Sequence, residues 1–160
     1  MDRSHRFPRS MMLAMMAAAV IAFAGGAALA GECPAGKTGT DVTRPGPSAP
    51  VGVTDKVLTT IDVAQEPAAI KDRLFRIRRL EVKPGGVVPW HSHGNRPALI
   101  YIVSGAITEY ASNCSVPIVH KAGDVARETS VTSHWWKNHT RRTVVLLSAD
   151  LLQDRNDKNM

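Results

Sequence analysis

Two histidines two residues apart, His91 and His93, are the residues of this chain whose spacing most directly suggests chemistry. The pattern around them is that of a β-strand, in which residues two apart point to the same face. Both imidazoles then project to one side, where they can bind one metal ion. The same spacing also occurs in ordinary half-exposed strands, so the interpretation depends on the residues around the pair.

Turn residues and a third histidine occur in order around this pair. Pro84, Gly85 and Gly86 predict a tight turn immediately before the strand. Beyond the pair, small or polar residues follow the next apolar runs of the chain: Gly105, Gly123, Asp124, His134 and Asn138.

These positions resemble the two sequence motifs of the cupin superfamily. The residues that fall on the motif positions are Gly85, His91, His93 and Gly105 for the first motif, and Gly123, His134 and Asn138 for the second. The resemblance covers roughly residues 55–152. It implies a double-stranded β-helix jelly-roll barrel whose interior holds a metal ion on His91, His93 and His134.

Three residues depart from the motifs. Ala98 stands where the family has a glutamate ligand, and Thr129 and Val131 replace a proline and a glycine in a turn. Three neutral imidazoles with open coordination positions suit a divalent transition metal; we favour Fe(II), with Mn, Ni, Cu or Zn as alternatives. Glu109 or Glu128 can provide a fourth ligand from another strand.

Several polar residues near the motifs are candidates for contact with a substrate. Arg96 can fork onto a substrate carboxylate, or lie on the surface as an ordinary loop residue. Tyr101 can donate a hydrogen bond into the pocket or pack in the core, and Trp136 can form a pocket wall. His120 and His139 are expected on the surface.

The N-terminal region has the features of an export signal. Residues 1–30 combine a basic start, an apolar run and the small-residue sequence Ala28-Leu29-Ala30, which predicts a signal peptide cleaved after Ala30. The mature protein is then periplasmic or secreted and has no stable membrane anchor. Cys33 and Cys114 both lie in the exported part, where an even count predicts a disulfide.

The rest of the chain predicts an all-β domain. Residues 31–52 are rich in proline and glycine and predict an extended arm, 53–152 the barrel, and 153–160 a frayed tail. Eight runs have the composition of strands: 57–63, 74–82, 87–93, 98–103, 106–110, 116–119, 125–131 and 143–152. A short helix is allowed only around 68–73, and the apolar run 144–147 is a candidate edge for a homodimer.

Charge and motifs narrow the function. The net charge of +6 is spread over scattered basic residues, and the group Arg76, Arg78 and Arg79 is interpreted as a solvated face, so nucleic acid is not the expected partner. The leading hypothesis is an exported mononuclear metal-dependent oxidoreductase, similar to the three-histidine dioxygenases of the superfamily, acting on a small organic and preferably anionic substrate. The alternative is a non-catalytic periplasmic cupin that binds a small molecule or a metal.

Overall fold

The computed structural model describes residues 32–153, so the predicted signal peptide and nearly all of the predicted tail lie outside the described residues. The described part contains eight β-strands and one 3-10 turn, which confirms the all-β prediction. The elements are β1 (Val51–Asp62), η1 (Val63–Gln65), β2 (Leu74–Ser92), β3 (Ala98–Ser104), β4 (Ala106–Ala111), β5 (Ile118–Lys121), β6 (Val125–Glu128), β7 (Ser133–Lys137) and β8 (Val144–Leu152). Within this part of the chain, no helix is long and apolar enough to cross a membrane.

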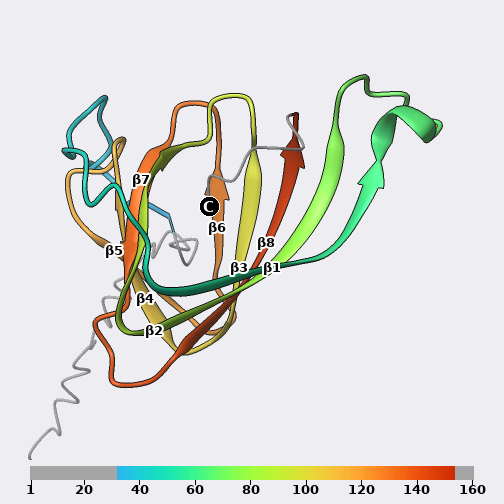
Figure 1. Cartoon of the computed structure of the whole chain (residues 1–160). Coiled ribbons are helices and arrows are strands. Elements are labelled where there is room, and N and C mark those ends of the chain that lie inside the picture. Colours follow the sequence, from blue (N-terminus) through green and yellow to red (C-terminus); the bar gives the residue numbers. More distant parts are fainter. Residues whose placement is uncertain (1–31, 154–160) are drawn as a thin grey trace, which may run out of the picture.

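The strands form one antiparallel sheet that curls into a nearly closed barrel (Figure 1). Its strand order is β5-β4-β7-β2-β8-β3-β6, and β1 pairs with β2 outside this path. The first half of β2 lies between β1 and β8, and its second half pairs with β7. The order of the strands and their curvature are those of a jelly-roll barrel.

A bend at Gly85 and Gly86 allows β2 to serve both sides of the barrel. Gly85 has φ of 73°, a conformation that residues with a Cβ rarely adopt. A Cβ on Gly86 would lie 2.8 Å from the carbonyl oxygen of Lys83, so the chain cannot fold this tightly with a larger residue. Beyond the bend, β2 pairs with β7 in a register that sets His91 directly opposite His134.

The barrel interior is filled by the inward-facing residues of alternating strands. In β8 buried and half-buried residues alternate along the whole strand, as expected for a sheet with one covered face. The main core cluster is built from aliphatic side chains together with one tryptophan: Leu80, Val82, Val88, Ala98, Ile100, Ile102, Ile107, Ala126, Trp136, Val144 and Leu146. The polar site lies inside the same barrel.

Three predictions about local structure are wrong. Residues 68–73 form turns rather than a helix, and the 3-10 turn lies earlier, where the Asp62 carboxylate accepts a hydrogen bond from the Ala64 amide. The strand β6 ends at Glu128 and a turn separates it from β7, whereas the sequence predicted one strand over 125–131. Residues 144–147 are not an edge, because β8 pairs with both β2 and β3.

The N-terminal arm is tied to the barrel by the predicted disulfide. Cys33 and Cys114 are bonded, with their Cα atoms 5.7 Å apart, and the arm adds a bridge between Thr38 and Cys114. The bond closes a sequence separation of 81 residues, for which chain entropy gives a stabilisation of about 4 kcal/mol. A disulfide is the arrangement expected in an oxidising compartment.

Candidate metal centre

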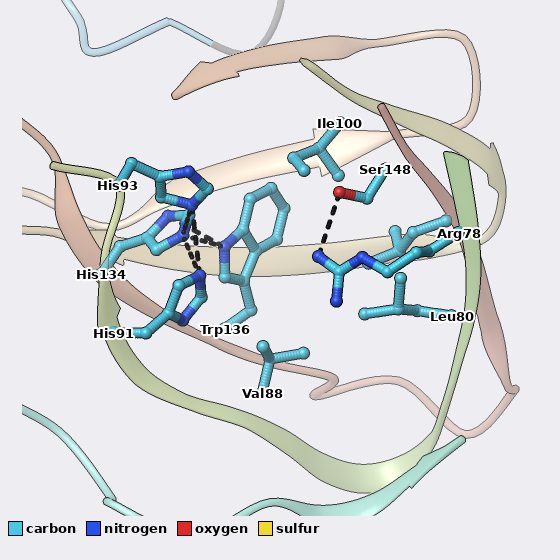
Figure 2. Close-up of a pocket in the computed structure, with 10 residues that line it drawn as sticks. Arg78, Leu80, Val88, His91, His93, Ile100, His134, Trp136 and Ser148 are labelled. Atoms are coloured by element: carbon cyan, nitrogen blue, oxygen red, sulfur yellow. Dashed lines mark hydrogen bonds between the residues drawn. The ribbon is translucent and has the colours of Figure 1, made fainter. Parts of the chain in front are cut away.

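Three histidine side chains converge inside the barrel. His91 comes from the end of β2, His93 from the turn that follows, and His134 from β7. The three Nε2 atoms lie 3.2 Å apart between His91 and His93, 3.0 Å between His93 and His134, and 3.1 Å between His134 and His91 (Figure 2). All three residues are buried. We call this group the histidine triad.

Hydrogen bonds on the far side of each ring fix where its proton lies. The Nδ1 atoms lie 2.9 Å from the carbonyl oxygen of Pro89 for His91, and 2.9 Å from that of Arg96 for His93. The Nδ1 of His134 lies 2.7 Å from the carboxylate of Glu109. Because carbonyl and carboxylate oxygens only accept, each Nδ1 carries the proton and each Nε2 presents a lone pair.

Three lone pairs that point at one another within 3.2 Å repel unless a cation lies between them. With a metal-to-nitrogen distance of about 2.1 Å, neighbouring ligands on one ion lie roughly 3.0 to 3.4 Å apart, depending on the coordination geometry. The triad therefore has the donor atoms, the tautomers and the spacing needed to hold one divalent metal ion.

The surroundings keep the rings of His91 and His93 neutral. Burial, followed by the proximity of His134, lowers the pKa of His91 to about 2 and that of His93 to about 3. Neutral imidazole is the form that coordinates metals. His91 and His93 can therefore bind a cation without losing protons at neutral pH.

Behind His134 lies a buried carboxylate that the sequence did not place. Glu109 in β4 accepts from His134 Nδ1 at 2.7 Å and from His120 Nε2 at 2.8 Å. Burial alone would raise the pKa of Glu109, but the two histidine hydrogen bonds outweigh it and hold the pKa at about 2. A carboxylate hydrogen-bonded to a metal-ligating histidine orients the ring and increases its basicity.

The prediction that His120 lies on the surface is wrong. Its side chain is fully buried and stacks on Trp136, with ring centroids 4.6 Å apart. Ile118 and His120 are the two buried residues of β5. Because side chains alternate along a strand, the inward position of Ile118 could have indicated that His120 also points inward. The hydrogen bond to Glu109 offsets part of the desolvation cost of burying this polar ring.

The second candidate carboxylate, Glu128, lies in β6 directly opposite Ala98 of β3. Its Oε1 is 3.4 Å from His134 Nδ1. Burial, with the neighbouring Glu109 charge second, raises the pKa of Glu128 well above its ordinary value. Both glutamates therefore lie on the Nδ1 side of His134, and neither is placed as a fourth ligand beside the Nε2 atoms.

A small pocket opens in front of the triad. The centre of a water-sized sphere can occupy about 20 Å³ of it, so the pocket admits small molecules only. Aliphatic side chains and an indole form the walls between two polar ends, with the triad at one end and Arg78 and Ser148 at the other (Figure 2). The complete lining is Arg78, Leu80, Val88, His91, His93, Ile100, His134, Trp136, Leu146 and Ser148.

Arginines form the far end of the barrel interior, contrary to the prediction of a solvated face. Arg76 donates to both oxygens of Asp150 at 2.9 and 2.7 Å, and Arg96 donates to the same carboxylate at 3.2 Å. Arg78 donates to Asp55 at 2.6 Å. We call Arg76, Arg78 and Arg96 with Asp150 the arginine cluster; the interactions of Asp150 with these arginines lower its pKa despite burial.

The three predicted substrate-contacting residues lie in different places. Trp136 lines the pocket, and its indole nitrogen lies 3.0 Å from Nδ1 and 3.5 Å from Nε2 of His134, with the two rings at 78°. The indole N–H therefore points at the ring face. Arg96 is buried against Asp150 rather than in the pocket lining, and its carbonyl orients His93.

Tyr101 is placed away from the pocket. It is 43% exposed, because Ile100 and Ile102 take the inward positions of β3 and Tyr101 alternates with them. Asn138, a residue of the second motif, has a structural hydrogen-bonding role: its amide donates to the carbonyl oxygens of Val82 at 2.9 Å and Arg142 at 2.7 Å.

Comparison with known proteins agrees with this architecture. The sequence model of the cupin domain matches residues 78–150. No curated protein matches the sequence significantly. Among solved structures, the Cnp3 cupin domain of Schizosaccharomyces pombe is 16% identical with a TM-score of 0.50, over 65% of this chain and 66% of that one.

Two further structures carry names that refer to oxalate. A predicted oxalate decarboxylase from Thermotoga maritima is 20% identical with a TM-score of 0.51, over 72% of this chain and 97% of that one. An oxalate oxidase in complex with the substrate analogue glycolate is 19% identical with a TM-score of 0.51; this chain covers 59% of its length, and the match takes 72% of this chain. At these identities the similarity shows the fold. The match to the cupin domain model identifies residues 78–150 of this chain as a cupin domain.

Proposed function

We propose that this protein is an exported, mononuclear metal-dependent oxidoreductase that acts on a small anionic molecule, with Fe(II) as the favoured ion. The observation that carries the proposal is the convergence of three unprotonated Nε2 atoms in a buried pocket. Export is supported by the disulfide between Cys33 and Cys114.

His91, His93 and His134 would hold the ion. A redox-active divalent ion held by these imidazoles would supply electron-transfer chemistry toward a substrate and O2. The carboxylate of Glu109 fixes the His134 tautomer and supplies the negative charge that Ala98 does not. The apolar walls exclude water, which strengthens electrostatic interactions inside the pocket.

A second function, non-catalytic binding of a small molecule or a metal, is favoured by the composition of the pocket. Beyond the triad, its polar lining consists of Arg78, Ser148 and the indole of Trp136, and no carboxylate faces the space. A reaction that needs a general base would have to draw it from the substrate or from solvent. Turnover is therefore what separates the two functions.

Metal content of the mature protein tests the proposal. Protein purified without an affinity tag is expected to contain nearly one equivalent of transition metal by mass spectrometry. The His91→Ala/His93→Ala variant should contain none, whereas His139→Ala, which removes an exposed histidine, should match the wild type. Failure to take up added Fe(II), Zn(II) or Cu(II) would overturn the enzymatic function and metal binding, and would leave non-catalytic binding of a small molecule.

Oxygen consumption separates an enzyme from a binder. Fe(II)-loaded protein is expected to consume O2 when supplied with a panel of short carboxylates, and the His134→Ala variant should not. Ligand-dependent thermal stabilisation without O2 consumption would instead establish the non-catalytic function.

A further inference from the structure

The pocket end opposite the histidine triad is formed by a buried guanidinium, that of Arg78 (Figure 2). Arg78 belongs to the inward-facing residues of β2 and is 3% exposed. A guanidinium stays charged in proteins, so this position places a permanent positive charge beside an apolar space. The sequence pattern predicted only a solvated face at this position.

The hydrogen bonds of Arg78 leave part of its binding capacity unused. Its Nε is buried and has no hydrogen-bond partner. One terminal nitrogen donates to Asp55, and the other is 3.3 Å from the Ser148 hydroxyl and 3.5 Å from Asp150. Of the three arginines around Asp150, Arg78 is the most distant from its carboxylate, since Arg76 lies at 2.7 Å and Arg96 at 3.2 Å.

The one short ion pair of Arg78 is also its most solvated. The Asp55 side chain is 20% exposed and comes from β1, which lies outside the main strand path of the barrel. Water therefore screens the carboxylate on that side, while the pocket side of the guanidinium faces aliphatic carbon. Burial lowers the pKa of Arg78 in spite of Asp55 and Asp150, as expected where nearby charges do not fully compensate.

We propose that Arg78 is the anion-binding residue of this pocket, and that the ligand is a short carboxylate with a second oxygen donor, bound between Arg78 and an ion on the triad. A guanidinium fork matches a carboxylate in geometry and charge. The small size of the pocket restricts the ligand to a short carboxylate. The role of the second donor rests on the proposed metal site, whereas anion binding by Arg78 does not.

Two changes alter the charge at this end in opposite directions. Arg78→Gln removes the cation and retains an N–H donor near Ser148 and Asp55. Asp55→Asn removes the competing carboxylate from a partly exposed edge position, so Arg78 is freed while the pocket lining is unchanged. Arg79→Gln is the matched control, since Arg79 is 42% exposed on the opposite face of β2, where it pairs with Glu81.

Calorimetric titration of metal-free protein with acetate, and with its neutral isostere acetamide, tests the anion site alone. Acetate should bind the wild type and acetamide should not. The dissociation constant for acetate should rise at least tenfold in Arg78→Gln, fall at least threefold in Asp55→Asn, and change less than twofold in Arg79→Gln. Equal acetate affinity in Arg78→Gln and Arg79→Gln overturns the assignment, as does an Asp55→Asn variant that binds acetate no more tightly than the wild type.

Malonate titrated into Zn(II)-loaded protein tests the second donor. Malonate should bind at least tenfold more tightly to the loaded protein than to the metal-free protein, and this gain should vanish in His91→Ala/His93→Ala. A gain that is absent from the loaded wild type overturns the two-ended ligand. If the triad takes up no metal, the proposed function fails, and the acetate titration still decides the role of Arg78.

Discussion

The two polar ends of the barrel interior are both buried, but they are satisfied in different ways. In the arginine cluster, the Asp150 carboxylate accepts from Arg76 and Arg96, so the chain supplies both donor and acceptor. In the histidine triad, the Nδ1 atoms have partners and the Nε2 atoms converge on one another. At the first end a carboxylate of the chain compensates Arg76 and Arg96, whereas at the second end three unprotonated nitrogens converge on one point.

The largest expected effect on stability lies at the end of the barrel interior that holds the arginine cluster. Asp150→Asn keeps the shape of the side chain but removes the carboxylate shared by the arginines of the cluster. Removing one partner of a buried ion pair leaves uncompensated charge, so we expect the free energy of unfolding to fall by about 3 to 5 kcal/mol. Chemical denaturation of the metal-free protein measures this loss.

The control for this variant is Asp124→Asn, which changes a carboxylate that accepts one backbone hydrogen bond in an exposed turn. We expect it to cost less than about 1 kcal/mol. Metal content per folded Asp150→Asn molecule should equal that of the wild type. A variant as stable as the wild type would show that Asp150 does not hold this end together.

The cluster also shows where the sequence was informative and where it was not. Arg76 and Arg78 share the period of two of Leu74, Leu80 and Val82, so their inward direction was readable from β2. What the sequence concealed was the compensating carboxylate, which lies more than seventy positions further along the chain. Without that partner, charged residues are correctly expected on the outside.

The triad was easier to predict because its signal is local. His91 and His93 are separated by one residue, and the position of His134 followed from the second motif. The groups around the triad were not predictable, because Glu109 contacts both His134 and His120 only after β4 pairs with β5 and β7. Motif spacing identified the three converging histidines, and only the sheet register identified the carboxylate that orients His134.

We expect pH to have an intermediate effect on the free energy of unfolding, through His91 and His93 of the triad. The folded-state pKa values of His91 and His93, about 2 and 3, lie below the ordinary value of about 6.5. Below pH 6.5 the unfolded chain therefore binds more protons, and the free energy of unfolding of the metal-free protein falls as pH decreases. The raised pKa of Glu128 acts in the opposite direction.

A comparison of two proteins isolates the histidine contribution. Between pH 6 and pH 5, the wild type should lose about 2 kcal/mol more than the His91→Gln/His93→Gln variant, because Glu128 contributes equally to both. Denaturation at a series of pH values measures the difference. Parallel curves would mean that these two histidines take up protons in the folded protein, and that the triad is more open to water than its burial indicates.

The smallest expected effect is on metal affinity, and it concerns the hydrogen bond between His134 and Glu109. Glu109→Gln keeps a hydrogen-bond acceptor for His134 but removes the negative charge that stands in for the ligand missing at Ala98. Loss of such a partner typically reduces metal affinity by about tenfold to a hundredfold, which competition with a chelator can measure. Glu81→Gln, at an exposed position on the outside of β2, should leave affinity unchanged. If Glu109→Gln also binds metal normally, the charge behind His134 has no influence on the ion.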